Sequence, residues 1–203
     1  MKLYDSIGPN PRVVRIFMAE RGIELPRVAV DLRGGENRLS SYLAKNPAGQ
    51  LPCLELDDGT ALAEITAICE YLDETAPGPS LIGVTPEERA ECRMWTRRVD
   101  LNIAEPMATG YRFSDGLKMF ETRIRCVPEA APGLKLMAQD KLRWLDGLMA
   151  GRTFVCGERL TLADIMLFAF VEFGIRVGQP PDAALANIAA HRKRMAARPS
   201  AAA

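Results

Sequence analysis

The hydrophobic pattern of this chain changes once, and the change divides the sequence into two parts with different architectures. Residues 1–73 alternate strand and helix patterns, whereas every substantial segment after the linker has apolar residues at helical spacing. A chain of 203 residues accommodates one small and one medium domain. We therefore expect an α+β domain over residues 1–76, a linker rich in proline and glycine over residues 77–86, and an all-α helical bundle over residues 87–203.

The first part predicts the element order βαβ followed by ββα. Strands are expected at the start of the chain, at 27–32, and on both sides of "DDGT", whose Asp-Gly step is typical of a hairpin turn. Helices are expected at 10–22, which ends at a glycine, and at 64–74. A βαβ start of this kind implies two parallel strands joined by a right-handed crossover.

The second part predicts four long helical segments, at 87–113, 134–150, 162–175 and 182–198. Pro128 and Pro132 are expected to break any helix between residues 115 and 133. Before the third segment, Thr161 and Asp164 have the spacing of a capping box, so we interpret Asp164 as a folding element and not as a catalyst.

Charge and hydropathy exclude several classes of partner. The 26 basic residues equal the 26 acidic ones, so the chain has no general basic field for nucleic acid. The first residues lack the long apolar stretch of a signal peptide, and the most apolar later segment is interrupted by Glu172 and too short for a bilayer. We expect a cytoplasmic protein that does not enter a membrane.

The cysteines and the single histidine do not suggest a metal or redox site. Five cysteines without a C-x-x-C pair are expected to be small core residues. His191 is the only histidine, so the chain has few of the side chains that form zinc sites or histidine-containing catalytic triads. We therefore expect no metal. His191 lies in an Arg/Lys-rich segment and is expected at a solvated helix position.

Pro52, in "NPAGQLPCLEL", stands at the mouth of a short predicted strand. Proline cannot donate a ladder hydrogen bond and is confined to strand starts, edges and bulges. One interpretation is a simple strand-entry proline. The other is a cis Leu51-Pro52 bond, which would turn the chain and direct a neighbouring backbone group outward.

Three motifs in order resemble those of the cytosolic glutathione transferases. "NPAGQLP", "LAEITAICEYL" and "FVCGERLTLADI" are similar to that family's "NPxGxVPxL", "ESxAIxxYL" and "hxGxxxTxAD". The resemblance covers essentially the whole chain and points to bacterial, beta- or theta-like members. It implies a thioredoxin-like N-terminal domain, and it favours the cis bond at Pro52. Activity is a separate question, because this fold also occurs in non-catalytic proteins.

The resemblance implies a glutathione site in the first domain. Leu51 would pair its backbone N–H and C=O with the cysteinyl part of glutathione, with Pro52 setting the turn. Glu64 would pair with the ammonium group, and the N–H of Ile65 would bind the γ-glutamyl carboxylate. Ile65 replaces the family's serine, so Thr66 either supplies the missing hydroxyl or only caps the helix.

Two further residues have open alternatives. Asn37 falls where many relatives place a polar residue that contacts the glycyl carboxylate, but a loop asparagine is an equally good turn former. Asp100 falls on the long helix that lines the dimer interface in this family and passes an acidic residue into the neighbour's site. Its alternative is an ion pair with Arg97 on the same helix.

The family's usual sulfur-activating group is absent. Relatives with a catalytic serine or threonine carry it near Gly8 and Pro9, and the catalytic cysteine of beta-class members, which begin "MKLYYSxGAC", falls at Asn10. The Asn10 amide is the candidate donor to the thiolate, with Ser6 as the second candidate. Alternatively, Asn10 is the N-cap of a helix that begins at Pro11.

The resemblance implies a homodimeric glutathione transferase of the detoxification type. Glutathione would be the co-substrate, and its thiolate would attack a small apolar electrophile that the sequence does not identify. The alternative is a non-catalytic glutathione-binding or interaction module. A glutaredoxin-like thiol enzyme is disfavoured because the first cysteine is Cys53, outside the first strand-to-helix turn.

Overall fold

The computed structural model describes residues 1–203 and separates them into two compact units. The first unit comprises residues 1–81 and 200–203, and the second comprises residues 82–199. The last four residues therefore lie with the first unit and not with the helical one. Arg12 donates to the carbonyl of Ala201 at 3.0 Å, and the Ser200 hydroxyl donates to Glu20, so this turn is fixed on one helix of the first unit.

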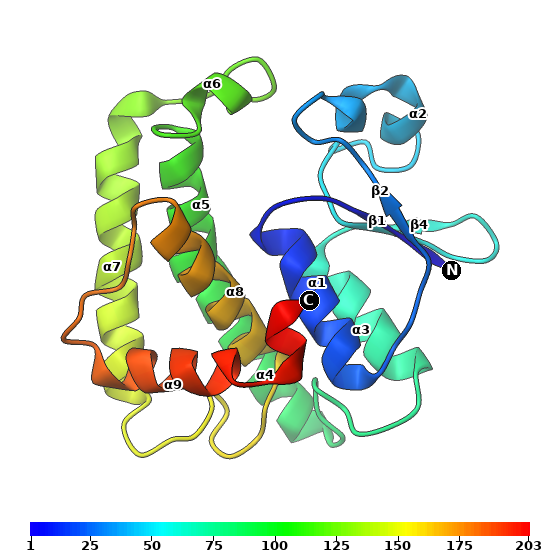
Figure 1. The fold of residues 1–203 in the computed structure, drawn as a ribbon. Helices are drawn as coiled ribbons and strands as arrows, with labels where there is room; N and C mark the ends of the chain where they lie inside the picture. Colours follow the sequence, from blue (N-terminus) through cyan, green and yellow to red (C-terminus); the bar gives the residue numbers. More distant parts are fainter. The chain divides into compact units, whose positions relative to one another are not determined.

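The first unit contains a four-stranded mixed sheet with the strand order β2-β1-β3-β4. Strand β1 pairs in parallel with β2 and antiparallel with β3, which pairs antiparallel with β4. Helices α1 and α3 lie side by side against one side of the sheet, and α2 lies on the other (Figure 1). The elements are β1 Lys2–Asp5, α1 Pro9–Arg21, β2 Arg27–Ala29, η1 Glu36–Arg38, α2 Ser40–Leu43, β3 Cys53–Glu55, β4 Ala61–Leu62 and α3 Ile65–Thr75. The predicted thioredoxin-like order βαβ-ββα is confirmed.

Two predicted boundaries in this unit are wrong. Helix α1 begins at Pro9, with Gly8 as its N-cap at φ 121°, so Asn10 is the second helical residue and not the cap. Proline is well suited to a first helical turn, because the N–H groups there have no partner within the helix. Strand β2 ends at Ala29 and not at residue 32, because Ala29 pairs with Asp5, the last residue of its one partner strand β1.

A buried ion pair joins the C-terminal ends of α1 and α3. Arg21 Nε lies 3.1 Å from Asp73 Oδ1, and both side chains are almost fully buried. The same guanidinium donates to the carbonyls of Asp73 and Ala76 at 3.0 and 2.8 Å, and Asp73 accepts from the N–H of Leu81 at 2.9 Å. Because these contacts fill hydrogen-bonding positions of both charged groups, the pair fixes the chain where it leaves α3.

The second unit is all-helical, which confirms the prediction of a helical bundle. Its elements are α4 Pro86–Val99, η2 Asp100–Ala104, α5 Glu105–Arg112, α6 Leu117–Phe120, η3 Pro128–Ala130, α7 Ala131–Leu148, α8 Leu162–Arg176 and α9 Ala186–Ala196. The terminal turn η4 Pro199–Ala202 begins at the last residue of this unit and continues into the first unit. Helices α5 and α7 pack together, and α9 packs on both α7 and α8 (Figure 1). The bundle therefore buries the apolar faces that the sequence pattern predicts.

Prolines shape this unit in two different ways. The run from α4 to α5 passes through a π-helical turn, in which the Glu105 N–H donates to the Asp100 carbonyl. Pro106 follows directly, and its ring would clash with the carbonyl four residues back in a regular helix, so the wider turn accommodates it. As predicted, no helix continues through Pro128 and Pro132: α6 ends at Phe120, and Pro132 falls in the first turn of the next long helix, α7, where proline is tolerated.

A buried polar network precedes helix α8. The Asp164 carboxylate accepts from the Thr161 N–H at 2.9 Å and from the Thr161 hydroxyl at 3.0 Å, which confirms the predicted capping box. Both of these contacts are with Oδ2; the other oxygen, Oδ1, accepts from the Val155 N–H at 2.7 Å and lies 3.1 Å from His191 Nε2. His191 is 1% exposed, so its predicted solvated position is wrong: the ring is buried against a carboxylate from another helix.

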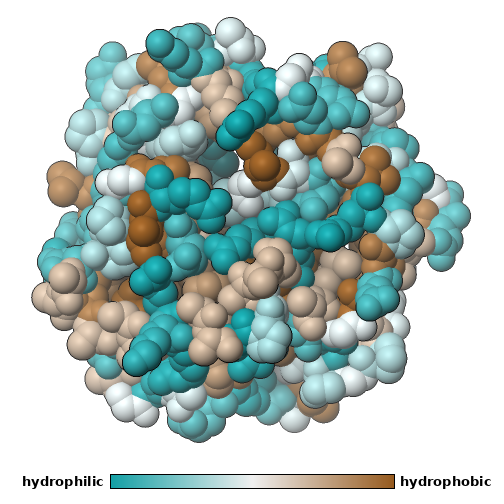
Figure 2. Space-filling view, viewed as in Figure 1, coloured by the Kyte–Doolittle hydropathy of each residue, from teal (hydrophilic) through white to brown (hydrophobic).

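On the face of the molecule shown in Figure 2, apolar residues are distributed in small groups among hydrophilic ones and do not form one large patch there. Four of the five cysteines are buried, as predicted, and Cys126 is partly exposed. No helix has the length and apolar character required to cross a membrane.

Asp164→Ala should destabilise the protein strongly. The substitution leaves the buried N–H groups of Val155 and Thr161 and the His191 ring without their carboxylate, and the expected loss is about 3 to 5 kcal/mol. This loss is measured as the decrease in the free energy of unfolding in urea. Asp140→Ala is the control: this carboxylate is 71% exposed and pairs only with Arg143 in α7, so the expected loss is below about 0.5 kcal/mol. Equal losses would contradict the role of the network.

Candidate functional site

The sheet register brings four chain segments to one edge of the first unit. Tyr4 in β1 pairs with Cys53 in β3, so the end of β1 lies beside the beginning of β3. Leu54 pairs with Leu62, which places the end of β4 at the same edge, and the parallel strand β2 also ends there. The segments that leave β1, β2 and β4 and the segment that enters β3 therefore converge.

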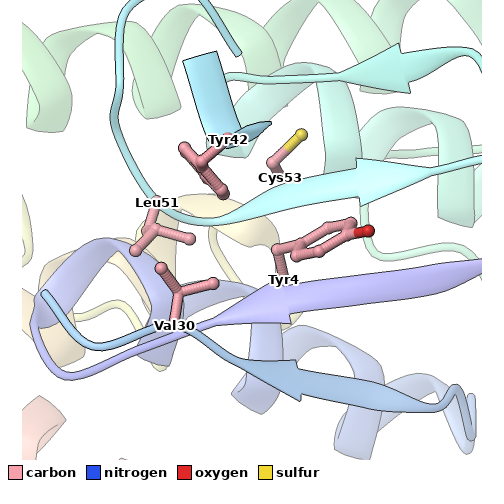
Figure 3. Packing of buried hydrophobic residues seen from close by; sticks show 5 residues of the cluster. All are labelled: Tyr4, Val30, Tyr42, Leu51 and Cys53. Atoms are coloured by element: carbon pink, nitrogen blue, oxygen red, sulfur yellow. The ribbon is translucent and has the colours of Figure 1, made fainter. Parts of the chain in front are cut away.

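Leu51 and Pro52 occupy this edge immediately before β3. The Leu51-Pro52 peptide bond is cis, as the family resemblance implies. The Leu51 side chain packs in a buried cluster with Tyr4, Val30, Tyr42 and Cys53, and Figure 3 shows Leu51 next to Val30. Within the chain, neither the N–H nor the C=O of Leu51 has a hydrogen-bond partner. Leu51 therefore presents a backbone donor and a backbone acceptor, and its buried side chain holds the residue in place.

The N-terminus of α3 lies at the same edge. Glu64 is its N-cap residue, is exposed, and is the one non-glycine residue with a positive φ, at 69°. Such conformations cost free energy and concentrate at functional sites. No side chain caps this helix, and the first N–H bonded to Glu64 is that of Ile68. The N–H groups of Ile65 and Thr66 remain open, and the alternative that Thr66 caps the helix is wrong.

Asn10 lies in the first turn of α1, which follows β1. Its neighbours Pro9 and Pro11 have no N–H, and the Arg12 N–H donates to the Gly8 carbonyl at 3.4 Å. Asn10 thus carries the one open backbone donor of the first three helical residues. Its half-buried side chain forms no hydrogen bond within the chain. Both amide groups of Asn10 are available at the positive end of the helix dipole.

Ser6 is fully engaged in holding the loop that leads to Asn10. Its hydroxyl donates to the Val30 carbonyl at 2.6 Å, and its N–H donates to Asp5 Oδ1 at 2.8 Å. Its carbonyl accepts from Arg15 Nη1 at 3.2 Å, and the same nitrogen donates to Asp5 at 2.7 Å. Because the hydroxyl proton is committed to Val30, we assign Ser6 a structural role and not a catalytic one.

Asn37 lies in the segment after β2 and is 2% exposed. Its Nδ2 donates to the Gly49 carbonyl at 2.6 Å, so the side chain braces the loop before Leu51. Its Oδ1 is buried without a hydrogen-bond partner. Because this oxygen is an acceptor, it would repel the glycyl carboxylate of glutathione and would not bind it. The geometry therefore assigns Asn37 to holding the loop before Leu51 and not to contacting a ligand carboxylate.

Asp100 belongs to the second unit. Its carboxylate pairs with Arg97 Nη1 at 3.1 Å, which confirms the alternative of an ion pair on the same helix. Burial raises the pKa of Asp100, and the nearby guanidinium opposes this shift. We do not include Asp100 in the site.

The sequence analysis missed Tyr42, Asn46 and Arg15, which support the edge from behind. Tyr42 and Asn46 bind the loop before Leu51, and Arg15 binds the loop before Asn10. The Asn46-Pro47 step is a turn signal that points to Asn46, whereas Tyr42 and Arg15 have no local signal. Burial raises the pKa of the Cys53 thiol, which disfavours Cys53 as a nucleophile. No group of three or more His, Cys, Asp and Glu side chains is arranged to hold a metal ion.

Comparisons with known proteins agree with this geometry. Residues 7–75 match the family model described as "Glutathione S-transferase, N-terminal domain", and residues 126–199 match "Glutathione S-transferase, C-terminal domain". Glutathione S-transferase 2 of Saccharomyces cerevisiae is 34% identical over 203 residues, which cover 98% of this chain and 87% of the yeast protein. The chain belongs to the glutathione S-transferase family.

Solved structures of this family have the same fold. A glutathione S-transferase domain-containing protein of Marinobacter aquaeolei is 38% identical and superposes with a TM-score of 0.94, covering 98% of this chain and 99% of that chain. A glutathione S-transferase of Methylobacillus flagellatus, solved with glutathione bound, is 25% identical with a TM-score of 0.83, covering 98% and 96% of the two chains. The edge described above is thus part of a glutathione S-transferase fold.

Proposed function

We propose that this protein binds glutathione at the sheet edge of its first unit and activates the thiolate for attack on a small apolar electrophile. The observation that carries the proposal is the convergence there of open hydrogen-bonding groups on Leu51, Ile65, Thr66 and Asn10. Glutathione offers a peptide backbone, a carboxylate beside an ammonium group, and a thiol. Each class of open group on the protein matches one of these features.

The open backbone of Leu51 fits the cysteinyl part of glutathione. An extended peptide that pairs with its N–H and C=O would add to the sheet edge as a short strand, and the hydrogen bonds would position the cysteinyl residue without contacting its side chain. The buried Leu51 side chain keeps this donor and acceptor in place before the ligand arrives, which lowers the entropy cost of binding.

The N-terminus of α3 fits the γ-glutamyl end. The N–H groups of Ile65 and Thr66 point out of the helix, where the helix dipole favours a negative charge such as the γ-glutamyl carboxylate. Glu64 supplies a carboxylate one residue earlier, which suits the ammonium group on the same ligand carbon. The Thr66 hydroxyl substitutes for the hydroxyl that Ile65 lacks.

The amide of Asn10 and the N-terminus of α1 fit the thiolate. A free thiol has a pKa of about 8.5, so a catalyst that acts near neutral pH must favour the anion. The Asn10 N–H and side-chain amide are donors to sulfur, and the dipole of α1 acts in the same direction. Neither group takes up a proton, so stabilisation of the anion is the whole contribution of Asn10.

In the proposed reaction, the thiol proton passes to solvent, the thiolate sulfur forms a bond to an electrophilic carbon, and the leaving group departs with the electron pair of the bond that breaks. Conjugation and ligand cleavage begin with such an attack on carbon, whereas reduction begins with attack of the same thiolate on an electrophilic oxygen or sulfur atom. The homodimeric state, the cytoplasmic location and a detoxifying role belong to the same proposal and are supported by family membership alone.

Glu64→Ala should weaken glutathione binding and leave the fold intact. Loss of a charge-assisted hydrogen bond should cost about 1.5 to 3 kcal/mol of binding free energy, measured by calorimetry. Glu24→Ala, which removes an exposed acid from the loop before β2, is the control and should bind glutathione normally. If both variants bind like the unaltered protein, Glu64 has no part in the site.

Asn10→Ala should raise the pKa of bound glutathione. Turnover should then fall about tenfold at about pH 6.5, where the thiolate fraction is limiting, and less than about twofold at about pH 9. The readouts are thiolate absorbance and conjugation of an aryl halide over this pH range. Ser6→Ala should leave the pH profile unchanged while lowering stability by about 1 kcal/mol. An equal loss at both pH values in Asn10→Ala would show that Asn10 only shapes the loop.

A further inference from the structure

The turn that precedes Leu51 is organised around one buried asparagine. Asn46 is 4% exposed, and every polar group it carries is paired. Its N–H donates to the Tyr42 carbonyl at 3.0 Å, and its carbonyl accepts from the Gly49 N–H at 2.8 Å. Its Oδ1 accepts from the Ala48 N–H at 3.1 Å, and its Nδ2 donates to the Gln50 carbonyl at 2.9 Å. The turn is therefore closed on itself before it reaches Leu51.

Two consecutive carbonyls of this turn point into the protein. The Gln50 carbonyl accepts a second hydrogen bond, from the Tyr42 hydroxyl at 2.6 Å, in addition to that from Asn46. The Gly49 carbonyl accepts from Asn37. Because Tyr42, Asn46 and Asn37 are all buried, these donors lie beneath the turn and not on its surface.

The turn also requires Gly49. Its φ is 62°, and a Cβ atom there would lie 3.0 Å from the Asn37 carbonyl oxygen and 2.9 Å from Arg38 Nη1. Both the left-handed backbone and the close approach of α2 and η1 exclude a side chain. The Gly49 and Gln50 carbonyls consequently reach the buried donors at hydrogen-bond distance.

Peptide planarity transmits this arrangement to Leu51. The Gln50 carbonyl and the Leu51 N–H belong to one trans peptide group, in which the oxygen and the hydrogen point in opposite directions. Two buried donors hold the oxygen inward, so the Leu51 N–H must point outward. This geometry explains why the Leu51 N–H has no partner within the chain although the residue itself is buried.

We propose that Tyr42 and Asn46 are positioning residues that set the direction of the Leu51 N–H toward the peptide backbone of glutathione. The inference rests on the proposed function, but its residues do not overlap with those assigned to contact the ligand. Tyr42 is well placed for this role because its ring is held edge-on against Tyr4, with ring centroids 6.0 Å apart. Burial also raises the pKa of Tyr42, which keeps its hydroxyl protonated as a donor.

Tyr42→Phe tests the proposal, because it removes the donor and keeps the ring. The matched control is Tyr4→Phe, which removes the hydroxyl of the adjacent ring, whose partner is Glu55 and not the turn. We expect Tyr42→Phe to raise the calorimetric Kd for glutathione about three- to tenfold, as loss of one hydrogen bond predicts, with kcat at saturating glutathione unchanged. Tyr4→Phe should change the Kd less than about twofold at a comparable loss of stability.

Equal Kd values for the two variants, or a fall in kcat without a change in Kd, would overturn the proposal. A second readout needs no glutathione: the NMR order parameter of the Leu51 amide should decrease in Tyr42→Phe and not in Tyr4→Phe. An unaltered protein that does not bind glutathione would refute the proposed function. In that case a decreased Leu51 order parameter would still support the positioning role, and an unchanged one would refute it.

Discussion

The pairing of β1 with β3 is the constraint on which the site depends. Because these strands are antiparallel while β2 runs parallel to β1, the end of β1, the end of β2 and the beginning of β3 lie at one edge of the sheet. The β3–β4 hairpin adds the start of α3 to the same edge. A change of one residue in this register would place Tyr4 and Cys53 on opposite faces of the sheet and would displace the loops that bind the ligand.

Both units use a buried polar side chain to fix a turn that precedes a structural element. Asp164 pairs with the backbone before α8 and with His191, and Asn46 pairs with the backbone before β3. In each case one side chain satisfies several buried groups that would otherwise lose their hydrogen bonds to water. The first network stabilises the helical unit, whereas the second also determines where an open N–H points.

Local patterns in the sequence predicted the elements better than the roles of single residues. The change of period, the Asp-Gly hairpin and the Thr161/Asp164 spacing act over a few residues, and the structure confirms them. The burial of His191 depends on a carboxylate 27 positions away, which no local pattern reveals. Likewise, the start of α1 was misplaced because Pro9, Asn10 and Pro11 all suit a first helical turn.

The candidate site was predictable where it depends on backbone and unpredictable where it depends on distant partners. The motifs that resemble the family's imply the cis bond at Pro52 and the acid at the start of α3, whereas the Ser6 hydroxyl is bound to the carbonyl of Val30, a partner 24 positions away that no local pattern reveals. Asn37 was placed in the correct loop, but its contact with Gly49 depends on the folded turn.

Amide chemical shifts during a glutathione titration of the isotopically labelled protein test whether the ligand binds at this edge of the sheet. We expect the largest changes at the amides of Asn10, Leu51, Ile65 and Thr66, whose N–H groups have no partner within the chain. The opposite end of the sheet, around residues 22–27, should not respond. Changes there, with the four edge amides unaffected, would contradict the account.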